Sequence, residues 1–571
     1  MERSHLRFGN LRLLLVIAAL VAAWFSLHGE LYSAWWLVVF PVLFVGLAAM
    51  HANVLRRRTA TERAAEFYSR GLARMEDRWA GVGSTGERID AAASLYASDL
   101  DLFGQGSLFQ LLSLARTQMG EDTLAGWLLQ ASSAAQILER QTAVAELRTS
   151  LDLREDVAVL DEDLRVGVHP ARLMEWAEAR DRLGPEWMRW VARVLAVAAG
   201  GAAIYWAETG QKAAFFLIVA GEALLTAALR KQSAGMLNTA EHAHKDLKLL
   251  ASMLARLERE RFVCPRLEAI EAGLTSQRVA GSEAIGRLGT IVELIHSREN
   301  PAMRLLDIPL LYTVQIAFAA DAWRKAHGTA VRGWLDAVGE MEALLSLAGY
   351  SYEHPADPFP EIAEGAPCFA ATGLGHPLLP SATCVRNDMR LCGETKVVLI
   401  SGSNMSGKST LMRAVGINTV LAMAGAPVRA AGLQLTPLHI GASILINDSL
   451  QEGSSRFYAE ITRLREICAL AEERSVLFLM DELLQGTNSS DRLVGAEGLV
   501  RALLASGAIG LISTHDLALT GIGGDADSRL RNVHLQDFIE DGRMKFDFKL
   551  QDGVVTKSNG IELMRLIGLK V

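Results

Sequence analysis

The chain has 571 residues, half of which are apolar, and a formal net charge of −8. This length predicts several domains, and the acidic balance gives the whole chain no basic footprint for nucleic acid. The five cysteines are sparse and lack CxxC spacing, which predicts reduced cytosolic thiols and disfavours a metal site. They are Cys264, Cys368, Cys384, Cys392 and Cys468.

Two apolar runs open the chain. Leu11 to Leu27 is apolar except for Arg12, and Ala34 to Met50 is apolar throughout. Each run is near the minimum of roughly 17 residues that crosses the hydrocarbon of a bilayer. Arginines precede the first run and follow the second, whereas the loop between them has neither Lys nor Arg. This predicts a transmembrane hairpin with both ends in the cytoplasm. A cleaved signal peptide is the competing interpretation, and the second run directly behind the first disfavours it.

A second pair of apolar runs spans Val194–Ala207 and Ala213–Leu229, and basic residues flank the pair on both sides. Two interpretations compete, a second membrane hairpin and a buried hairpin in a soluble core. We expect the membrane hairpin. Because a carboxylate in a bilayer costs on the order of 3 kcal/mol, Glu222 should face a partner helix or be protonated.

The middle of the chain has a helical pattern, from Thr59 to Trp187 and again from Gln232 to Tyr350. Apolar residues recur there at spacings of three and four, as on one face of a helix. Three prolines between 355 and 360 mark a linker, and strand–loop–helix alternation typical of an α/β domain follows.

The stretch SGSNMSGKST, residues 401–410, follows the apolar strand Val397–Ile400 and precedes a helical pattern. It fits G-x-x-x-x-G-K-[ST], in which backbone N–H groups and a helix N-terminus hold phosphate. Lys408 would reach the β- and γ-phosphates, and the Ser409 hydroxyl would ligate Mg²⁺. The predicted nucleotide contacts in this loop are Gly402, Ser403, Asn404, Met405, Ser406, Gly407, Lys408, Ser409 and Thr410.

Two further strands end in polar residues. The strand Val476–Met480 runs into Asp481, which would hold Mg²⁺, and Glu482, which would polarise the attacking water. The strand in IGLISTHD, residues 509–516, ends near His515, which we expect on the γ-phosphate side. The sequence therefore predicts an enzyme that hydrolyses a nucleoside triphosphate with Mg²⁺, with Glu482, His515 and Lys408 as catalytic residues and Ser409 and Asp481 as metal ligands.

The motifs resemble those of the MutS mismatch-repair ATPases, and their order along the chain is the same. GSNMSGKST is similar to the family's phosphate loop, with Ser403 and Ser406 as departures. The other matching segments are GHPLL (375–379), VRND (385–388), DSLQEGSSRFYAEI (448–461), MDELLQGTNSSDR (480–492), STHD (513–516), NVHL (532–535), QDG (551–553) and KSNGIELMRLIGL (557–569).

The resemblance implies an ABC-class ATPase that acts as a homodimer, with ATP and Mg²⁺ as cofactors. Ser455 would then contact the γ-phosphate bound by the other subunit, and Val385 and Asn387 fit the nucleotide-contacting positions. Cys384 stands where the family often has an aromatic side chain that packs on adenine. Arg456 replaces a small hydroxyl residue, and two interpretations stay open, a charge across the interface and a solvated side chain.

These elements together predict a multidomain protein with α-helical transmembrane hairpins, an α-helical MutS-like core and lever domain, and an α/β P-loop ATPase domain of the ABC class. The predicted boundaries are 1–58 and 188–231 for the hairpins, 59–187 and 232–354 for the helical core, and 355–571 for the ATPase domain. We find no mismatch-reading segment, and the second hairpin falls where MutS proteins carry their levers and DNA clamp.

Two functions follow from this organisation. The first is an ATPase of the inner cell membrane, with its helical core and ATPase domains in the cytoplasm, whose nucleotide-driven dimer closure moves levers and membrane segments. The second is a membrane-tethered ATPase of mismatch-repair type that binds duplex DNA. An ABC transporter is a weaker third interpretation, because the segment 448–461, which resembles the MutS signature segment, is not similar to the LSGGQ signature of transporters.

Overall fold

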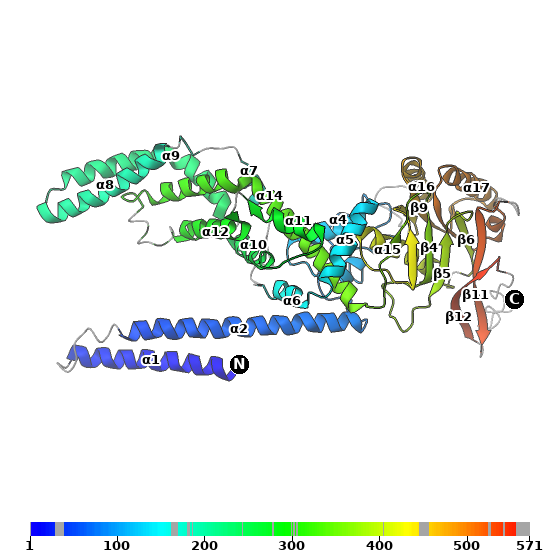
Figure 1. Cartoon of the computed structure of the whole chain (residues 1–571), viewed down its shortest axis with the longest axis horizontal. Helices are drawn as coiled ribbons and strands as arrows, with labels where there is room; N and C mark the ends of the chain where they lie inside the picture. The colour runs from blue at the N-terminus through cyan, green and yellow to red at the C-terminus, as the bar shows by residue number, and fades with distance from the viewer. Residues whose placement is uncertain are drawn as a thin grey trace. The chain divides into compact units, whose positions relative to one another are not determined.

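The computed structural model describes residues 2–28, 39–160, 170–179, 183–185, 187–241, 244–276, 279–297, 300, 303, 307–403, 405–444, 456–522, 527–540 and 543–555 (Figure 1). The chain forms two compact units. The first comprises residues 1–72 with 152–162, and the second comprises residues 73–151 with 163–571.

The first unit contains helices α1 (Glu2–His28) and α2 (Val39–Met75) and nearly all of α6 (Leu151–Val159). Arg12, the charged residue within the first apolar run, has partners on α2. Its guanidinium donates to His51 Nδ1 at 3.3 Å and lies 4.9 Å from the centroid of the Phe44 ring. The charge in the apolar run is therefore directed at the neighbouring helix.

The second unit begins with a helical region. Its shorter helices are α3 (Leu108–Leu112), α4 (Gln118–Leu129), α5 (Ala134–Leu147), α7 (Pro170–Glu178), α10 (His244–Leu257), α11 (Pro265–Gly273) and α12 (Gly281–Ser297). Ser and Thr side chains cap several of them. Thr117 accepts from Gly120 N at the start of α4, and Ser133 and Gln136 form a capping box at the start of α5.

The longest helix, α14 (Tyr312–Glu353), has 42 residues and packs against α4, α5, α7, α9 and α12. Two of its glycines lie where neighbours approach most closely. A Cβ at Gly328 would lie 2.4 Å from the Ala177 carbonyl oxygen on α7, and one at Gly339 would lie 3.0 Å from the Met119 carbonyl oxygen on α4. The neighbouring helices can therefore contact the α14 backbone directly.

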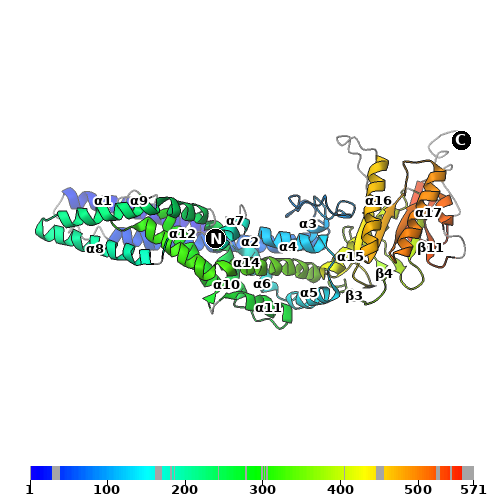
Figure 2. The same ribbon diagram turned by 90° about the horizontal axis from the view of Figure 1, so that it is seen from above.

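Helices α8 (Trp187–Thr209) and α9 (Ala213–Glu241) form the second hairpin and lie side by side (Figures 1 and 2). Glu222 is fully buried in this hairpin, and neither of its carboxyl oxygens has a hydrogen-bond partner among the described residues. Arg193 does not reach it and instead lies over the Trp190 ring at 5.0 Å. A buried pair of Arg193 with Glu222, which a soluble hairpin would have favoured, is therefore absent from the described hairpin.

Two mixed sheets follow, with the strands β3 (Glu361–Ile362), β4 (Phe369–Leu374), β5 (Asn387–Leu391), β6 (Val397–Ser401), β7 (Gly432–Leu435), β8 (His439–Ser443), β9 (Val476–Asp481), β10 (Ile509–Thr514), β11 (Leu530–Glu540) and β12 (Arg543–Asp552). The larger sheet has the order β12-β11-β6-β10-β9-β8, and all its pairings are parallel except β11 with β12. The smaller sheet has the order β3-β7-β4-β5. A separate two-stranded ribbon pairs β1 (Thr275–Ser276) with β2 (Val279–Ala280).

Apolar runs explain the centre of the larger sheet. Every residue of β6 and β10 is buried, as expected of parallel strands that are covered on both faces. Helices α15 (Lys408–Ala424), α16 (Arg456–Glu473) and α17 (Ser489–Ala505) and the short helix η3 (Leu517–Gly521) accompany this sheet. The strands expected at 397–400, 476–480 and 509–514 are confirmed.

The prediction of five reduced thiols is wrong for two of them. Cys368 and Cys392 form a disulfide with a Cα–Cα distance of 4.6 Å. They flank antiparallel strands β4 and β5, in which Phe369 pairs with Leu391, so the register places the two thiols opposite each other. Cys264, Cys384 and Cys468 are free.

Candidate functional site

The glycine-rich loop joins the end of β6 to the start of α15. Gly402 and Gly407 have φ angles of 150° and 95°, in the region that favours glycine. A Cβ at Gly402 would lie 2.8 Å from the Leu535 carbonyl oxygen, so this position also has no room for a side chain. The loop therefore turns tightly next to β11.

Lys408 is buried inside this loop. Its Nζ donates to the carbonyl oxygens of Gly402 at 2.9 Å and Ser403 at 2.8 Å. Burial lowers the pKa of Lys408, and the charges of Glu482 and Asp481 oppose this shift. Ser406 Oγ also donates to the Ser403 carbonyl, at 2.8 Å.

The end of β9 brings its acidic residues to the same place. The Ser409 hydroxyl donates to Asp481 Oδ2 at 2.5 Å, and the Ser513 hydroxyl on β10 donates to Asp481 Oδ1. One hydroxyl and one carboxylate are the kind of protein donor set that Mg²⁺ uses when phosphates and water supply its remaining ligands. Ser409 and Asp481 therefore fit a magnesium site. Among the described residues, no group of three or more His, Cys, Asp or Glu side chains could hold a metal by itself.

Glu482 and His515 lie close together at the carboxyl edge of the sheet. His515 Nδ1 is 3.4 Å from Glu482 Oε1, and Gln485 Nε2 donates to Glu482 Oε2. The His515 side chain is 47% exposed and that of Glu482 is 24% exposed. Both are thus open to a molecule that arrives from solvent.

Asn387 at the start of β5 and Cys384 just before it both make hydrogen bonds within the protein. The Asn387 amide is bound on both of its polar atoms by β12, where it donates to the Phe548 carbonyl and accepts from Leu550 N. Cys384 lies against the Gly375–His376 segment, where its Sγ accepts from His376 N at 3.2 Å. Burial, with a contribution from Arg413, lowers the pKa of His376 to about 4. This imidazole is therefore neutral at physiological pH.

Phe548 is a residue that the sequence did not single out. A Cβ at Gly407 would lie 3.0 Å from its ring, so Phe548 packs directly on the glycine loop. The residue has a φ of 53°, a conformation that a bulky side chain rarely adopts, and its side chain is 41% exposed. The only feature of the sequence that could have indicated this role is the position of Phe548 shortly before QDG (551–553).

The other predicted nucleotide contacts differ in their exposure to solvent. Met405 is 75% exposed and Thr410 is exposed, whereas Ser406 is buried. Val385 is half-buried beside β5. Asn404, Ser455 and the segment 557–569 lie outside the described residues.

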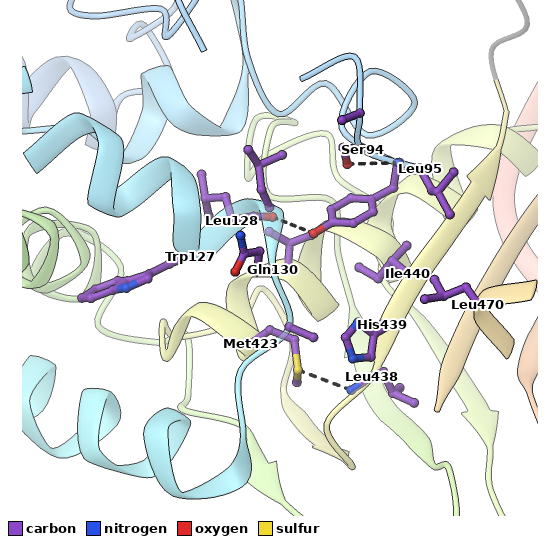
Figure 3. Close-up of a pocket in the computed structure, with 15 residues that line it drawn as sticks. Ser94, Leu95, Trp127, Leu128, Gln130, Met423, Leu438, His439, Ile440 and Leu470 are labelled. Carbon is purple, nitrogen blue, oxygen red and sulfur yellow. Dashed lines mark hydrogen bonds between the residues drawn. The ribbon is translucent and has the colours of Figure 1, made fainter. Parts of the chain in front are cut away.

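A cavity of about 170 Å³ lies elsewhere, between the helical region and the larger sheet (Figure 3). Its lining comprises Ala93, Ser94, Leu95, Tyr96, Trp127, Leu128, Leu129, Gln130, Ala131, Val420, Met423, Leu438, His439, Ile440 and Leu470. Tyr96 Oη donates to the Leu128 carbonyl beside it. Met423 and Lys408 are on the same helix and about 22 Å apart at 1.5 Å per residue, so this cavity is separate from the glycine loop.

The fold and the site define an α/β domain. A glycine-rich loop joins strand β6 to helix α15, and acidic residues lie at the carboxyl end of β9, which is separated from β6 by one strand, β10. Residues 398–570 match MutS domain V. The C-terminal part of the chain is therefore similar to this domain of the MutS family.

Curated relatives match a limited region. The chain is 33% identical over 239 residues to the DNA mismatch repair protein MutS of Shouchella clausii, which covers 41% of this chain and 27% of that protein. It is 34% identical over 238 residues to the proteins of the same name from Bacillus mycoides and Bacillus cereus, in each case 41% of this chain and 26% of the relative. The match thus spans about a quarter of the length of these relatives.

Proposed function

We propose that the C-terminal domain binds ATP with Mg²⁺ and hydrolyses it. One observation carries the proposal: Lys408 and Ser409 at the start of α15 lie close to Asp481 and Glu482 at the carboxyl end of β9 in the larger sheet. Lys408 binds the phosphates, and Ser409 and Asp481 hold Mg²⁺, which would neutralise phosphate charge. Glu482 orients water and accepts its proton, and His515 keeps that carboxylate in place.

The site is completed by a second copy of the chain. This part of the proposal rests on the family resemblance, which assigns Ser455 to the γ-phosphate bound by the partner. Two exposed apolar side chains on the first two turns of α16 are compatible with such an interface, because Tyr458 is 66% exposed and Ile461 is 42% exposed.

The apolar helices anchor the protein in a membrane. Three helical stretches are long and apolar enough to cross one, within Val39–Met75, Trp187–Thr209 and Ala213–Leu237. Val197, Leu217 and Leu224 are each more than 70% exposed, so the second hairpin presents large apolar side chains that a bilayer would cover. Nucleotide-driven closure would then move the helical core and these segments.

Measurement of ATP hydrolysis by the detergent-solubilised full chain tests this function. Glu482→Gln keeps the shape of the side chain and loses the base, so it should bind ATP normally and hydrolyse it about a hundredfold more slowly or worse. Lys408→Ala should weaken binding itself. Turnover by Glu482→Gln at the wild-type rate would contradict the role given to Glu482.

Duplex DNA binding is the second candidate function, and the names of the relatives favour it. Its test is binding of matched and mismatched duplexes by the solubilised protein across a salt series, because phosphate contacts make affinity fall steeply with salt. Saturable binding at physiological salt would support it, and its absence would favour the membrane function.

A further inference from the structure

The turn that follows β9 has an unusual backbone. Glu482 and Leu484 have φ angles of 51° and 55°, in the left-handed region that side chains other than glycine rarely occupy. Such conformations persist only where the surrounding structure holds them. The direction of the Glu482 side chain therefore depends on whatever fixes this turn.

A carboxylate on α16 holds the turn from one side. Glu460 Oε1 accepts the backbone N–H of Leu484 at 2.6 Å, and Glu460 is only 3% exposed. The same turn rests directly on the helix, because a Cβ at Gly486 would lie 2.6 Å from Phe457 Cβ.

A guanidinium on α17 holds it from the other side. Arg492 donates to the carbonyl oxygens of Leu484 at 3.2 Å, Gln485 at 3.4 Å and Thr487 at 3.3 Å. Arg492 also pairs with Asp516, the neighbour of His515, at 3.8 Å. The N–H side and the carbonyl side of the turn are thus bound by opposite charges from two helices.

Helix α16 is itself fixed by the helical region. Arg463, three residues after Glu460, pairs with Asp99 at 3.5 Å, and Asp99 Oδ1 accepts Ile444 N at 2.7 Å. The Leu95 carbonyl accepts Ala442 N at 2.8 Å, so the segment 95–99 runs along the edge strand β8. A connected path leads from this segment through α16 to the turn that carries Glu482.

We propose that Glu460 and Arg492 are positioning residues for ATP hydrolysis, which fix the turn so that Glu482 faces Lys408 and His515. Asp99 sets the position of the helix that carries Glu460 and so links this turn to the helical region. This inference rests on the proposed ATPase function and adds residues that do not touch ATP themselves.

The test compares three variants of the full chain. Glu460→Ala removes the acceptor for Leu484 N–H, and kcat should fall by about tenfold to a hundredfold while Kd for a non-hydrolysable ATP analogue changes by less than about twofold. Glu460→Gln keeps an acceptor oxygen and should retain most of the wild-type kcat. Glu466→Ala changes an exposed glutamate on the same helix and serves as the matched control, with no expected effect.

A second variant covers the case in which Glu460→Ala fails to fold. Arg492→Ala removes the donors on the other side of the turn and should also lower kcat without changing analogue binding. If wild-type protein hydrolyses ATP and both alanine variants keep its kcat, the positioning proposal is overturned and the ATPase function stands. Loss of analogue binding together with kcat would also overturn it, because a general structural defect and not the aim of Glu482 would then explain the result. Wild-type protein without any ATP hydrolysis would overturn both proposals.

Discussion

Asn387 and Phe548 are 161 residues apart and are joined through the backbone of Phe548. The Asn387 amide donates to the Phe548 carbonyl at 2.9 Å and accepts the N–H of Leu550 at 2.8 Å. This bidentate contact fixes β12 at the point where the Phe548 ring covers Gly407. Phe548 is thus an exposed aromatic side chain that packs on the glycine loop.

Phe548→Ala should weaken ATP binding by about tenfold, because it removes an aromatic face next to the phosphate loop. Phe548→Tyr should bind nearly as tightly as wild type, since the ring is kept. Titration with a fluorescent ATP analogue gives both affinities. Equal affinities for the alanine variant and wild type would show that the ring does not contribute to the site.

Lys408→Ala and Ser455→Ala should complement each other in mixed dimers. If each site combines the glycine loop of one subunit with Ser455 of the other, a heterodimer of the two variants has one intact site. ATPase activity of purified heterodimers should therefore approach half that of wild type, while each parent is inactive. Heterodimers as inactive as their parents would contradict a shared site.

A single cysteine at Thr209 should react with a membrane-impermeant thiol reagent added to intact cells. Thr209 ends α8 at the turn of the second hairpin, and the flanking basic residues predict cytoplasmic ends. The background needs the five native cysteines replaced, with labelling measured by mass shift. Labelling only after the membrane is broken would place this turn inside and contradict the four-span topology.

The contribution of Glu342 to stability should fall as pH rises from about 4.5 to 7. Burial raises its pKa to about 7, although hydrogen bonds from Thr117 and from the backbone of Arg116 oppose the shift. In this window the folded state keeps a proton that the unfolded chain releases, so deprotonation costs up to about 3 kcal/mol and the loss is complete above pH 7.

Thermal unfolding of wild type and Glu342→Gln, each measured from pH 5 to 8, checks this. Gln keeps one acceptor oxygen, for the N–H groups of Arg116 and Thr117, and does not titrate, so it should lose less stability than wild type as the pH rises. Parallel profiles would assign the slope to other groups.

The sequence predicted the parts of the site that are local. Continuous apolar runs marked β6, β9 and β10, and the glycine-rich motif was expected to join a strand to a helix, as it joins β6 to α15. Contacts between distant segments could not be predicted in the same way. Asp99 and Ile444 are 345 residues apart, and nothing in either segment alone specifies the other.

The disulfide between Cys368 and Cys392 depends on strand register. Cys368 and Cys392 pair because β4 and β5 are antiparallel neighbours in a particular register. A hairpin assignment for residues 369–391 would have placed the thiols opposite each other. The number and spacing of the cysteines predicted reduced thiols instead, because they carry no information about strand register.

Helix α14 has no proline between Tyr312 and Glu353, so its 42 residues form one rod of about 63 Å. Its C-terminal part is buried without interruption from Met341 to Ser351, and Glu342 in this part accepts a hydrogen bond from Thr117, the N-cap residue of α4. A tilt of about 5° around that buried end would displace the opposite end by about 5 Å, the pitch of one helical turn. A small tilt of α14 at its buried end therefore gives a large displacement at the other end. A spectroscopic distance probe near Tyr312 should report tilts that shift Glu342 too little to be detected there.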